Sequence, residues 1–208
     1  MIVQNPQNRR QVAAAIHHLL NAGYALNIFK RLMETLLWSV TCDLNKKDDI
    51  KYAKKYWSQN AIDLRKRNIE IRLKQKSEGK KQIDKNKGLT HEHTIPKSLI
   101  LDKLSKLKTP TETDIFNMLN AYEFAVVITK EEDNMMNAEP YRLRQSLPNG
   151  YSIDDDSSEE LILSRYIACQ IPLFEINLSN FSIIAPKLSF NENVFTVHED
   201  SYDWEERE

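Results

Sequence analysis

The residues best suited to chemistry lie in one short segment, which reads Leu-Thr-His-Glu-His-Thr-Ile-Pro-Lys from Leu89 to Lys97. If this segment is an extended strand, His91 and His93 point to one face and Glu92 points to the other, because side chains alternate along a strand. A neutral imidazole can deprotonate an attacking water near pH 7, and a carboxylate can hold a hard cation at a developing oxyanion. Metal-assisted hydrolysis of a phosphodiester needs both of these parts.

A strand-to-helix unit follows about thirty-five residues downstream of the two histidines. Residues Phe124 to Ile128 are apolar and partly β-branched, a composition that predicts a short buried strand. Thr129 comes next and Glu132 follows three residues later, so we expect a helix that begins with a capping box and ends or kinks at Pro140. Asp133 lies one residue beyond the box and is not needed for capping.

Helical periodicity dominates the other parts of the chain. Apolar residues at steps of three and four predict two helices between Val12 and Val40, separated near Gly23. A second long helical region is expected from Asp48 to about Lys76. A further helix is expected to start with Thr109 as its N-cap and Glu112 as its capping-box partner. It belongs to an insertion between the two expected strands, roughly residues 97–121, that we expect to fold as helices. Near the C-terminus the pattern predicts a helix from Leu161 to about Cys169 and a few strands between Phe174 and Val197.

The segment Glu92-His93-Thr94-Ile95-Pro96 resembles the first part of the active-site motif of the HNH endonucleases, which have a ββα-metal core. In that family a metal ligand directly precedes the general-base histidine at the end of the first strand. Residues Ala125 to Asp133 resemble the second strand and the helix of the core, which carry the other metal ligand. Leu143 to Pro148 and Arg165 to Ile171 resemble downstream segments of such proteins from phages and mobile elements. The resemblance covers roughly residues 88–172.

This resemblance implies a divalent-metal-dependent endonuclease that hydrolyses DNA in restriction, phage defence or a mobile element. His93 would be the catalytic base, while Glu92 and Asp133 would hold one Mg²⁺ or Mn²⁺, the ions that oxygen ligands favour over zinc. His91 and Glu132 are additional candidates, although the capping box also explains Glu132. The sequence does not identify the residue that would orient the base.

Cations are concentrated in one part of a chain whose formal net charge is −1. Between Lys46 and Lys87, fifteen Lys and Arg residues stand against six Asp and Glu residues, which leaves 14 − 24 = −10 for the rest of the chain. Such density is typical of a surface that binds a polyanion. The alternatives are a solvated helix face and neutralisation by the acidic C-terminal part. The candidate phosphate ligands are Arg142, Arg144, Lys54, Lys55, Lys66 and Arg67.

The fold class expected from these elements is α+β, mostly helical, with a small ββα-metal core and a short β-rich C-terminal segment. We divide the chain into an N-terminal helical and basic region (1–87), an HNH-like module (88–172) and a β-rich segment with an acidic tail (173–208). No apolar run approaches the ~20 residues of a membrane span, so we expect a cytoplasmic protein that does not bind a membrane. The basic stretch and the resemblance predict that its partner is nucleic acid. Cys42 and Cys169 lack the CxxC spacing of a zinc site.

One other class of function stays open at this point. An HNH-like core without activity could serve as a binding or assembly subunit in a phage–host conflict, with a protein partner or a second copy of the chain. Two features favour this alternative. The helix that Ala125 to Asp133 resembles has a histidine where this chain has Asp133, and an acidic segment such as the C-terminal tail can imitate nucleic acid. A nuclease assay with added metal separates the two classes.

Overall fold

The computed structural model describes residues 6–22, 30–42, 52–154, 157–191 and 194–198. The chain is about 49% helical and 19% strand, so the expected mixed α and β composition is confirmed. Gly23 lies outside the described residues. Cys42 and Cys169 are buried free thiols. None of the helices that the structure describes has the length and apolar composition needed to cross a membrane.

Six strands form one sheet in the order β2-β3-β1-β4-β5-β6. Strand β1 pairs with β3 in parallel, and every other neighbouring pair is antiparallel. The strands are β1 (Tyr56–Ser58), β2 (Leu89–His93), β3 (Ala125–Thr129), β4 (Leu173–Asn177), β5 (Ser182–Asn191) and β6 (Val194–Val197). Strand β2 therefore lies at one edge of the sheet, and the C-terminal strands β4 to β6 extend the same sheet at the other end.

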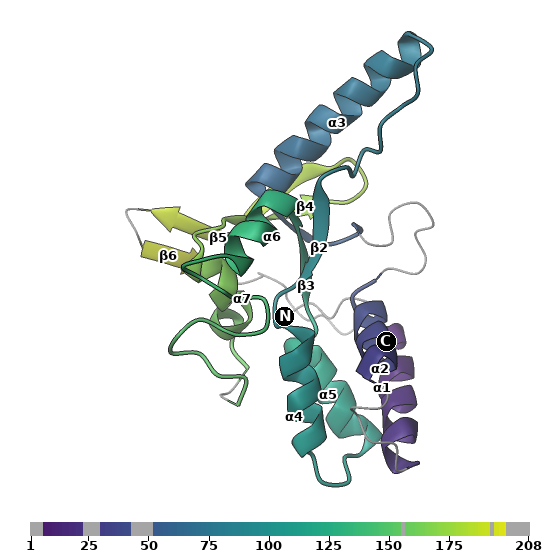
Figure 1. Cartoon of the computed structure of the whole chain (residues 1–208), viewed down its shortest axis with the longest axis vertical. Coiled ribbons are helices and arrows are strands. Elements are labelled where there is room, and N and C mark those ends of the chain that lie inside the picture. The colour runs from purple at the N-terminus through teal and green to yellow at the C-terminus, as the bar shows by residue number, and fades with distance from the viewer. Residues whose placement is uncertain (1–5, 23–29, 43–51, 155–156, 192–193, 199–208) are drawn as a thin grey trace.

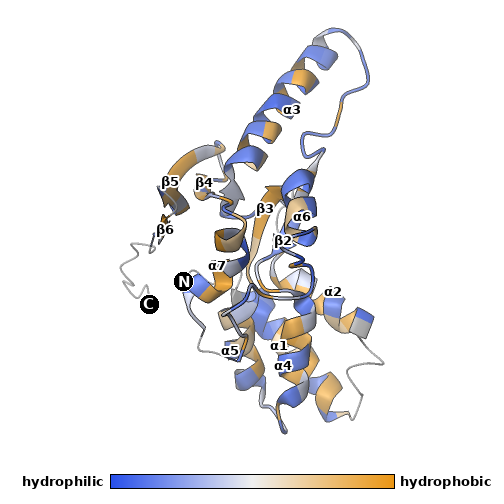
Figure 2. Ribbon diagram, turned by 60° about the vertical axis from the view of Figure 1, so that its left-hand side comes forward, coloured by the Kyte–Doolittle hydropathy of each residue, from blue (hydrophilic) through white to orange (hydrophobic). Residues whose placement is uncertain are grey.

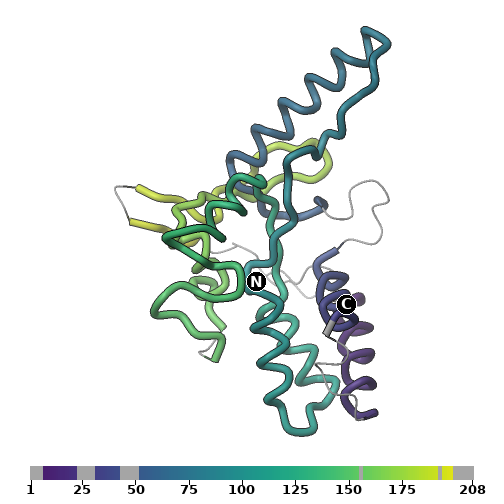
Figure 3. Tube along the Cα trace, viewed as in Figure 1, coloured from purple at the N-terminus to yellow at the C-terminus, as the bar shows by residue number. Residues whose placement is uncertain are grey.

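Seven helices surround the sheet within the described residues: α1 (Pro6–Asn21), α2 (Lys30–Val40), α3 (Gln59–Ser77), α4 (Lys97–Lys106), α5 (Glu112–Tyr122), α6 (Lys130–Asn137) and α7 (Glu159–Ala168). Helices α1, α2, α4 and α5 gather at one end of the molecule around a shared apolar core (Figure 1). The orange faces of these helices meet in Figure 2, whereas the outer part of α3 is mostly blue. Helix α3 extends away from the other end, and the chain returns beside it towards β2 (Figure 3).

A hairpin-like pair of strands followed by a helix lies at the centre of the molecule. Strands β2 and β3 are antiparallel, with Leu89 opposite Thr129 and His93 opposite Ala125. Helix α6 follows β3 directly, and α4 and α5 form the connection between the two strands. The predicted strand-to-helix unit and the helical insertion between the strands are both confirmed.

Two local predictions were wrong. Residues 56–58, expected within a helix, form β1, because Trp57 is fully buried between strands β3 and β4 and Ser58 caps α3 by accepting a hydrogen bond from the Ala61 amide. The N-cap of α5 is Thr111 instead of Thr109. Thr111 accepts from the Asp114 amide, which closes the capping box two residues later than expected.

Candidate functional site

Strand β2 carries the predicted site on two faces. The rings of His91 and His93 stack with their centroids 5.0 Å apart, so both lie on one face as the alternation predicts. Glu92 lies opposite Val126, whose side chain belongs to the apolar core shared with α6 and α7. Among the described residues β2 pairs with β3 alone. The other edge of β2, which pairs with no described strand, therefore lies between the face that carries the histidines and the face that carries Glu92.

Glu92 is held by a buried arginine from α7. Arg165 is 1% exposed, and its Nη1 donates to Glu92 Oε1 at 2.6 Å and to the His93 carbonyl oxygen at 2.9 Å. Burial raises the pKa of Glu92, the charge of Arg165 opposes this shift, and the charge of Asp133 adds to it. The negative charge of Asp133 therefore disfavours the ionised form of Glu92.

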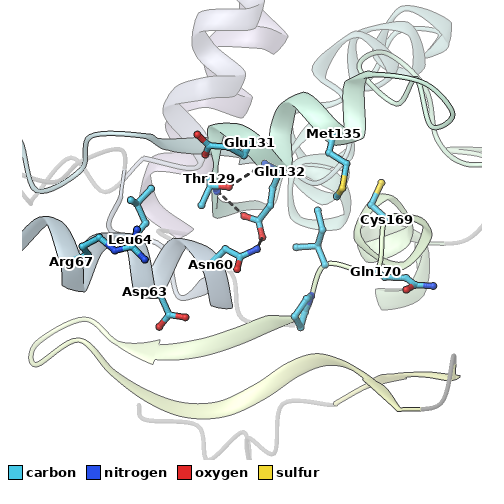
Figure 4. A pocket seen from close by; sticks show the side chains of 12 residues that line it. Asn60, Asp63, Leu64, Arg67, Thr129, Glu131, Glu132, Met135, Cys169 and Gln170 are labelled. Atoms are coloured by element: carbon cyan, nitrogen blue, oxygen red, sulfur yellow. Dashed lines mark hydrogen bonds between the residues drawn. The ribbon is translucent and has the colours of Figure 1, made fainter.

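Asp133 and Glu132 are neighbours in the first turn of α6 but have different surroundings. Glu132 is buried and accepts hydrogen bonds from the Thr129 amide at 2.8 Å, from Ser58 Oγ at 2.7 Å and from Asn60 Nδ2 at 3.0 Å. Figure 4 shows its carboxylate between Thr129 and Asn60 at the wall of a pocket. Asp133 is half-buried and accepts from Asn137 Nδ2 at 2.7 Å. The predicted capping role of Glu132 is confirmed, and its oxygens are already engaged within the protein.

His93 forms a dyad with a carboxylate that the sequence did not single out. Its Nδ1 lies 2.9 Å from Oε2 of Glu123, the residue that ends α5, and Glu123 is 1% exposed. Nε2 of His93 is buried and has no hydrogen-bond partner among the described residues. A carboxylate at Nδ1 holds the ring proton there and leaves Nε2 as a proton acceptor. Glu123 directly precedes the apolar run that forms β3, and this position is the sequence feature that could have indicated its role.

His91 has packing partners on the same face. Its Nε2 lies 3.0 Å from the hydroxyl of Thr41, and its ring centroid lies 6.1 Å from that of Trp38. These contacts attach the end of α2 to β2. The structure thus gives His91 a positioning role beside His93.

The donor set around Glu92 suits a hard divalent cation. Tyr166 is fully buried, and its pKa is raised well above 10 by burial and by the negative charges of Glu92 and Asp133. In the described part of the chain, no three His, Cys, Asp or Glu side chains form a group that could hold a metal. Mg²⁺ is commonly bound by one or two carboxylates together with substrate phosphates and water, so two oxygen donors are compatible with it.

The candidate phosphate ligands divide into buried and exposed groups. Lys54 is fully buried and donates to the Thr41 carbonyl, and Lys55 forms an ion pair with Glu175 at 3.0 Å. The assignment of Lys54 and Lys55 as phosphate ligands was therefore wrong. Lys54 binds a carbonyl at the end of α2 and Lys55 pairs with a carboxylate of β4, so both ammonium groups have partners inside the protein.

The four remaining cations are exposed but do not form one cluster. Lys66 and Arg67 lie on α3. Arg142 and Arg144 lie beyond α6, where Arg142 pairs with Glu139. Only the α3 pair belongs to the basic stretch, so α3 is the described element most suited to a polyanion.

Comparisons of the chain with protein-family models, with curated proteins and with solved structures found no match.

Proposed function

We propose that the protein is a divalent-metal-dependent nuclease of the ββα-metal type that hydrolyses phosphodiester bonds in DNA. The observation that carries the proposal is the His93–Glu123 dyad, in which His93 Nε2 has no hydrogen-bond partner among the described residues. Glu92 is the neighbour of His93 in the chain, and the charge of Asp133 acts on Glu92. A base and a metal-ligand pair are the two parts that phosphodiester hydrolysis requires. The β2-β3-α6 order supplies them from the end of the first strand and the start of the helix.

The free edge of β2 explains how residues on two faces can act on one phosphate. His93 and Glu92 are consecutive, so a phosphodiester lying across this edge would neighbour both residues. His93 Nε2 would accept the proton of the attacking water, and Glu123 would stabilise the imidazolium that forms. Arg165 fixes both the Glu92 carboxylate and the His93 carbonyl, so it positions the two residues relative to each other.

Glu92 and Asp133 would hold the cation, which when bound neutralises charge developing on the phosphate oxygens. The negative charge of Asp133 raises the pKa of Glu92, and a bound cation would offset this repulsion. Arg165 occupies Oε1 of Glu92 and leaves Oε2 for this purpose.

The outer part of α3 and the returning segment form an arm (residues 65–87) that would bind the DNA backbone. The arm extends away from the sheet and ends beside β2 (Figure 1). It contains ten Lys and Arg residues against three Asp and Glu residues. Backbone contacts of this kind supply affinity without sequence specificity.

The experiment is cleavage of supercoiled plasmid with Mg²⁺ or Mn²⁺, compared with the same reaction in EDTA. His93→Ala should lower the rate ~10²–10⁴-fold, because the base acts in the chemical step. Binding of the plasmid in EDTA should stay at the parent level. His17→Ala on α1 is the matched control, since His17 bonds only to Asn21 among described residues. Cleavage by His93→Ala at the parent rate would disprove the base assignment.

A second candidate function is a binding or assembly subunit without activity. One observation favours it: the guanidinium of Arg165 already neutralises Glu92. Metal-independent DNA binding together with no cleavage under any metal condition would support this function over the nuclease.

A further inference from the structure

A recess of about 480 Å³ opens on the histidine face of β2, at the base of the arm. We infer that this β2 recess binds one unpaired nucleotide of the nucleic-acid strand. The use made of that nucleotide rests on the proposed function, but the binding does not. The residues that carry the inference are Trp38, Tyr52, His91, Lys87 and Lys130, all of which line the recess. Its volume lies within the range typical of small-molecule sites.

One wall of the recess is aromatic. Trp38 projects from the last turn of α2 and remains half-buried, and its ring lies 6.1 Å from that of His91. Tyr52 is fixed by a hydrogen bond from its hydroxyl to the Leu89 carbonyl at 3.3 Å. Partly exposed rings of this kind stack on the flat faces of nucleobases, and they do so with every base.

Two cations also line the recess. Lys87 precedes β2 and Lys130 begins α6, and the backbone hydrogen bond from the Lys130 amide to the Gly88 carbonyl at 2.9 Å brings the two segments together. Both side chains are exposed, and neither pairs with an acidic group among the residues that the structure describes. The carboxylate of Asp84 also lines the recess, where it accepts from the Asn86 amide at 2.9 Å and shapes the turn. Two ammonium groups beside aromatic rings match a phosphate beside a base.

One residue of the recess touches the proposed catalytic base. His91 belongs to its wall, and the His91 ring stacks on that of His93 at 5.0 Å. A nucleotide in the recess would therefore neighbour the phosphate that His93 acts on. In a duplex the base faces are covered by stacking, so the recess requires an unpaired or extruded base. We therefore expect a preference for single-stranded over double-stranded segments at this position.

The test is binding of a labelled single-stranded 12-mer and the matched duplex to the full chain in EDTA, followed by fluorescence anisotropy. Trp38→Ala should weaken single-strand binding ~10-fold and leave duplex binding nearly unchanged, because it removes one stacking platform. Trp38→Phe should keep most of the affinity, which distinguishes stacking from a general effect on folding. Equal weakening of both ligands, or no weakening of either, would overturn the inference.

The lysines provide a second test that does not disturb the core. Lys87→Ala with Lys130→Ala should weaken single-strand binding more than Lys76→Ala with Lys81→Ala, which removes the same charge from exposed positions of the arm outside the recess. Equal losses in the two double variants would overturn the assignment of phosphate to the recess. A deoxynucleoside monophosphate that displaces the 12-mer as well as unlabelled 12-mer does would show that a free nucleotide is the ligand, and would also overturn it.

These outcomes are separable from those of the proposed function. The binding experiments use no metal and can be repeated with His93→Ala. Trp38-dependent binding without any plasmid cleavage would retain the recess and reject the nuclease. If cleavage depends on His93 but not on Trp38, and Trp38→Ala binds the single strand as the parent does, the nuclease is retained and the recess is rejected.

Discussion

The orientation of His93 depends on one carboxylate from another element. Glu123 Oε2 lies 2.9 Å from His93 Nδ1, and both side chains are buried. In Glu123→Gln the amide can still hydrogen-bond to the ring, but it carries no charge to stabilise the imidazolium that forms during proton transfer. We expect the cleavage rate to fall ~10²-fold while Kd for DNA in EDTA stays unchanged. A parallel loss of affinity and rate would instead indicate that Glu123 supports the fold.

Glu92 is expected to lower stability at neutral pH. Burial raises its pKa above the ordinary value of 4.5, so the folded state holds this proton more tightly than the unfolded state does. Stability from this group is therefore fully present below the unfolded pKa and is lost as pH rises through the folded pKa. Glu92→Gln keeps an oxygen that accepts a hydrogen bond from Arg165. Because the amide does not ionise, this variant does not lose stability as pH rises through the pKa of Glu92.

The measurement for Glu92 is urea unfolding in EDTA at pH 4 and at pH 7. The free energy of unfolding of Glu92→Gln, relative to the parent, should be higher at pH 7 than at pH 4. Asp154→Asn is a control, because that carboxylate is largely exposed and forms ion pairs at the surface. An unchanged difference between the two pH values would show that burial does not disfavour the Glu92 charge.

At the scale of the element, α6 begins with a structural carboxylate, Glu132, and with Asp133, the carboxylate that we propose as a metal ligand. Glu132→Ala removes the capping-box acceptor and leaves Ser58 and Asn60 without their partner, so it should lower the free energy of unfolding by ~1–3 kcal/mol. Asp133→Ala should have little effect on stability and should weaken Mn²⁺ binding, as measured by calorimetry. The reverse pattern would exchange the two roles.

The α3 arm provides a second prediction at this scale. Replacement of Lys66, Arg67, Lys74 and Lys76 by Glu should weaken binding to all DNA sequences alike. The slope of log K against log salt should become less steep by up to ~0.9 per lost contact. These side chains are exposed, so thermal stability should change little. An unaltered slope would mean that the arm is only a solvated helix face.

At the scale of the whole molecule, the segregation of charge predicts that the acidic C-terminal segment competes with nucleic acid for the arm. Residues 199–208 contain six acidic side chains and one arginine. If this segment competes with nucleic acid for the arm, a chain that ends at His198 should bind DNA more tightly at low salt, and the difference should vanish as salt screens the charges. The same affinity at every salt concentration would exclude such competition.

The sequence by itself determined the features that depend on neighbours along the chain. The alternation of His91, Glu92 and His93, the capping box of α6 and the helices of the insertion are confirmed by the structure. Each depends on interactions within one strand or one helical turn, and such interactions follow from residue types a few positions apart. The assignments of catalysis and metal binding stay predictions.

Only the tertiary structure decided which distant residues complete the site. Glu123 reaches His93 across 30 residues and Arg165 reaches Glu92 across 73, and no local pattern reports a contact of that range. Amino-acid composition likewise does not predict which lysines are buried. Lys54 belongs to a basic stretch, yet its ammonium group is buried and donates to the Thr41 carbonyl. Charge and periodicity are properties of the chain, whereas desolvation and convergence of side chains arise only when its elements pack together.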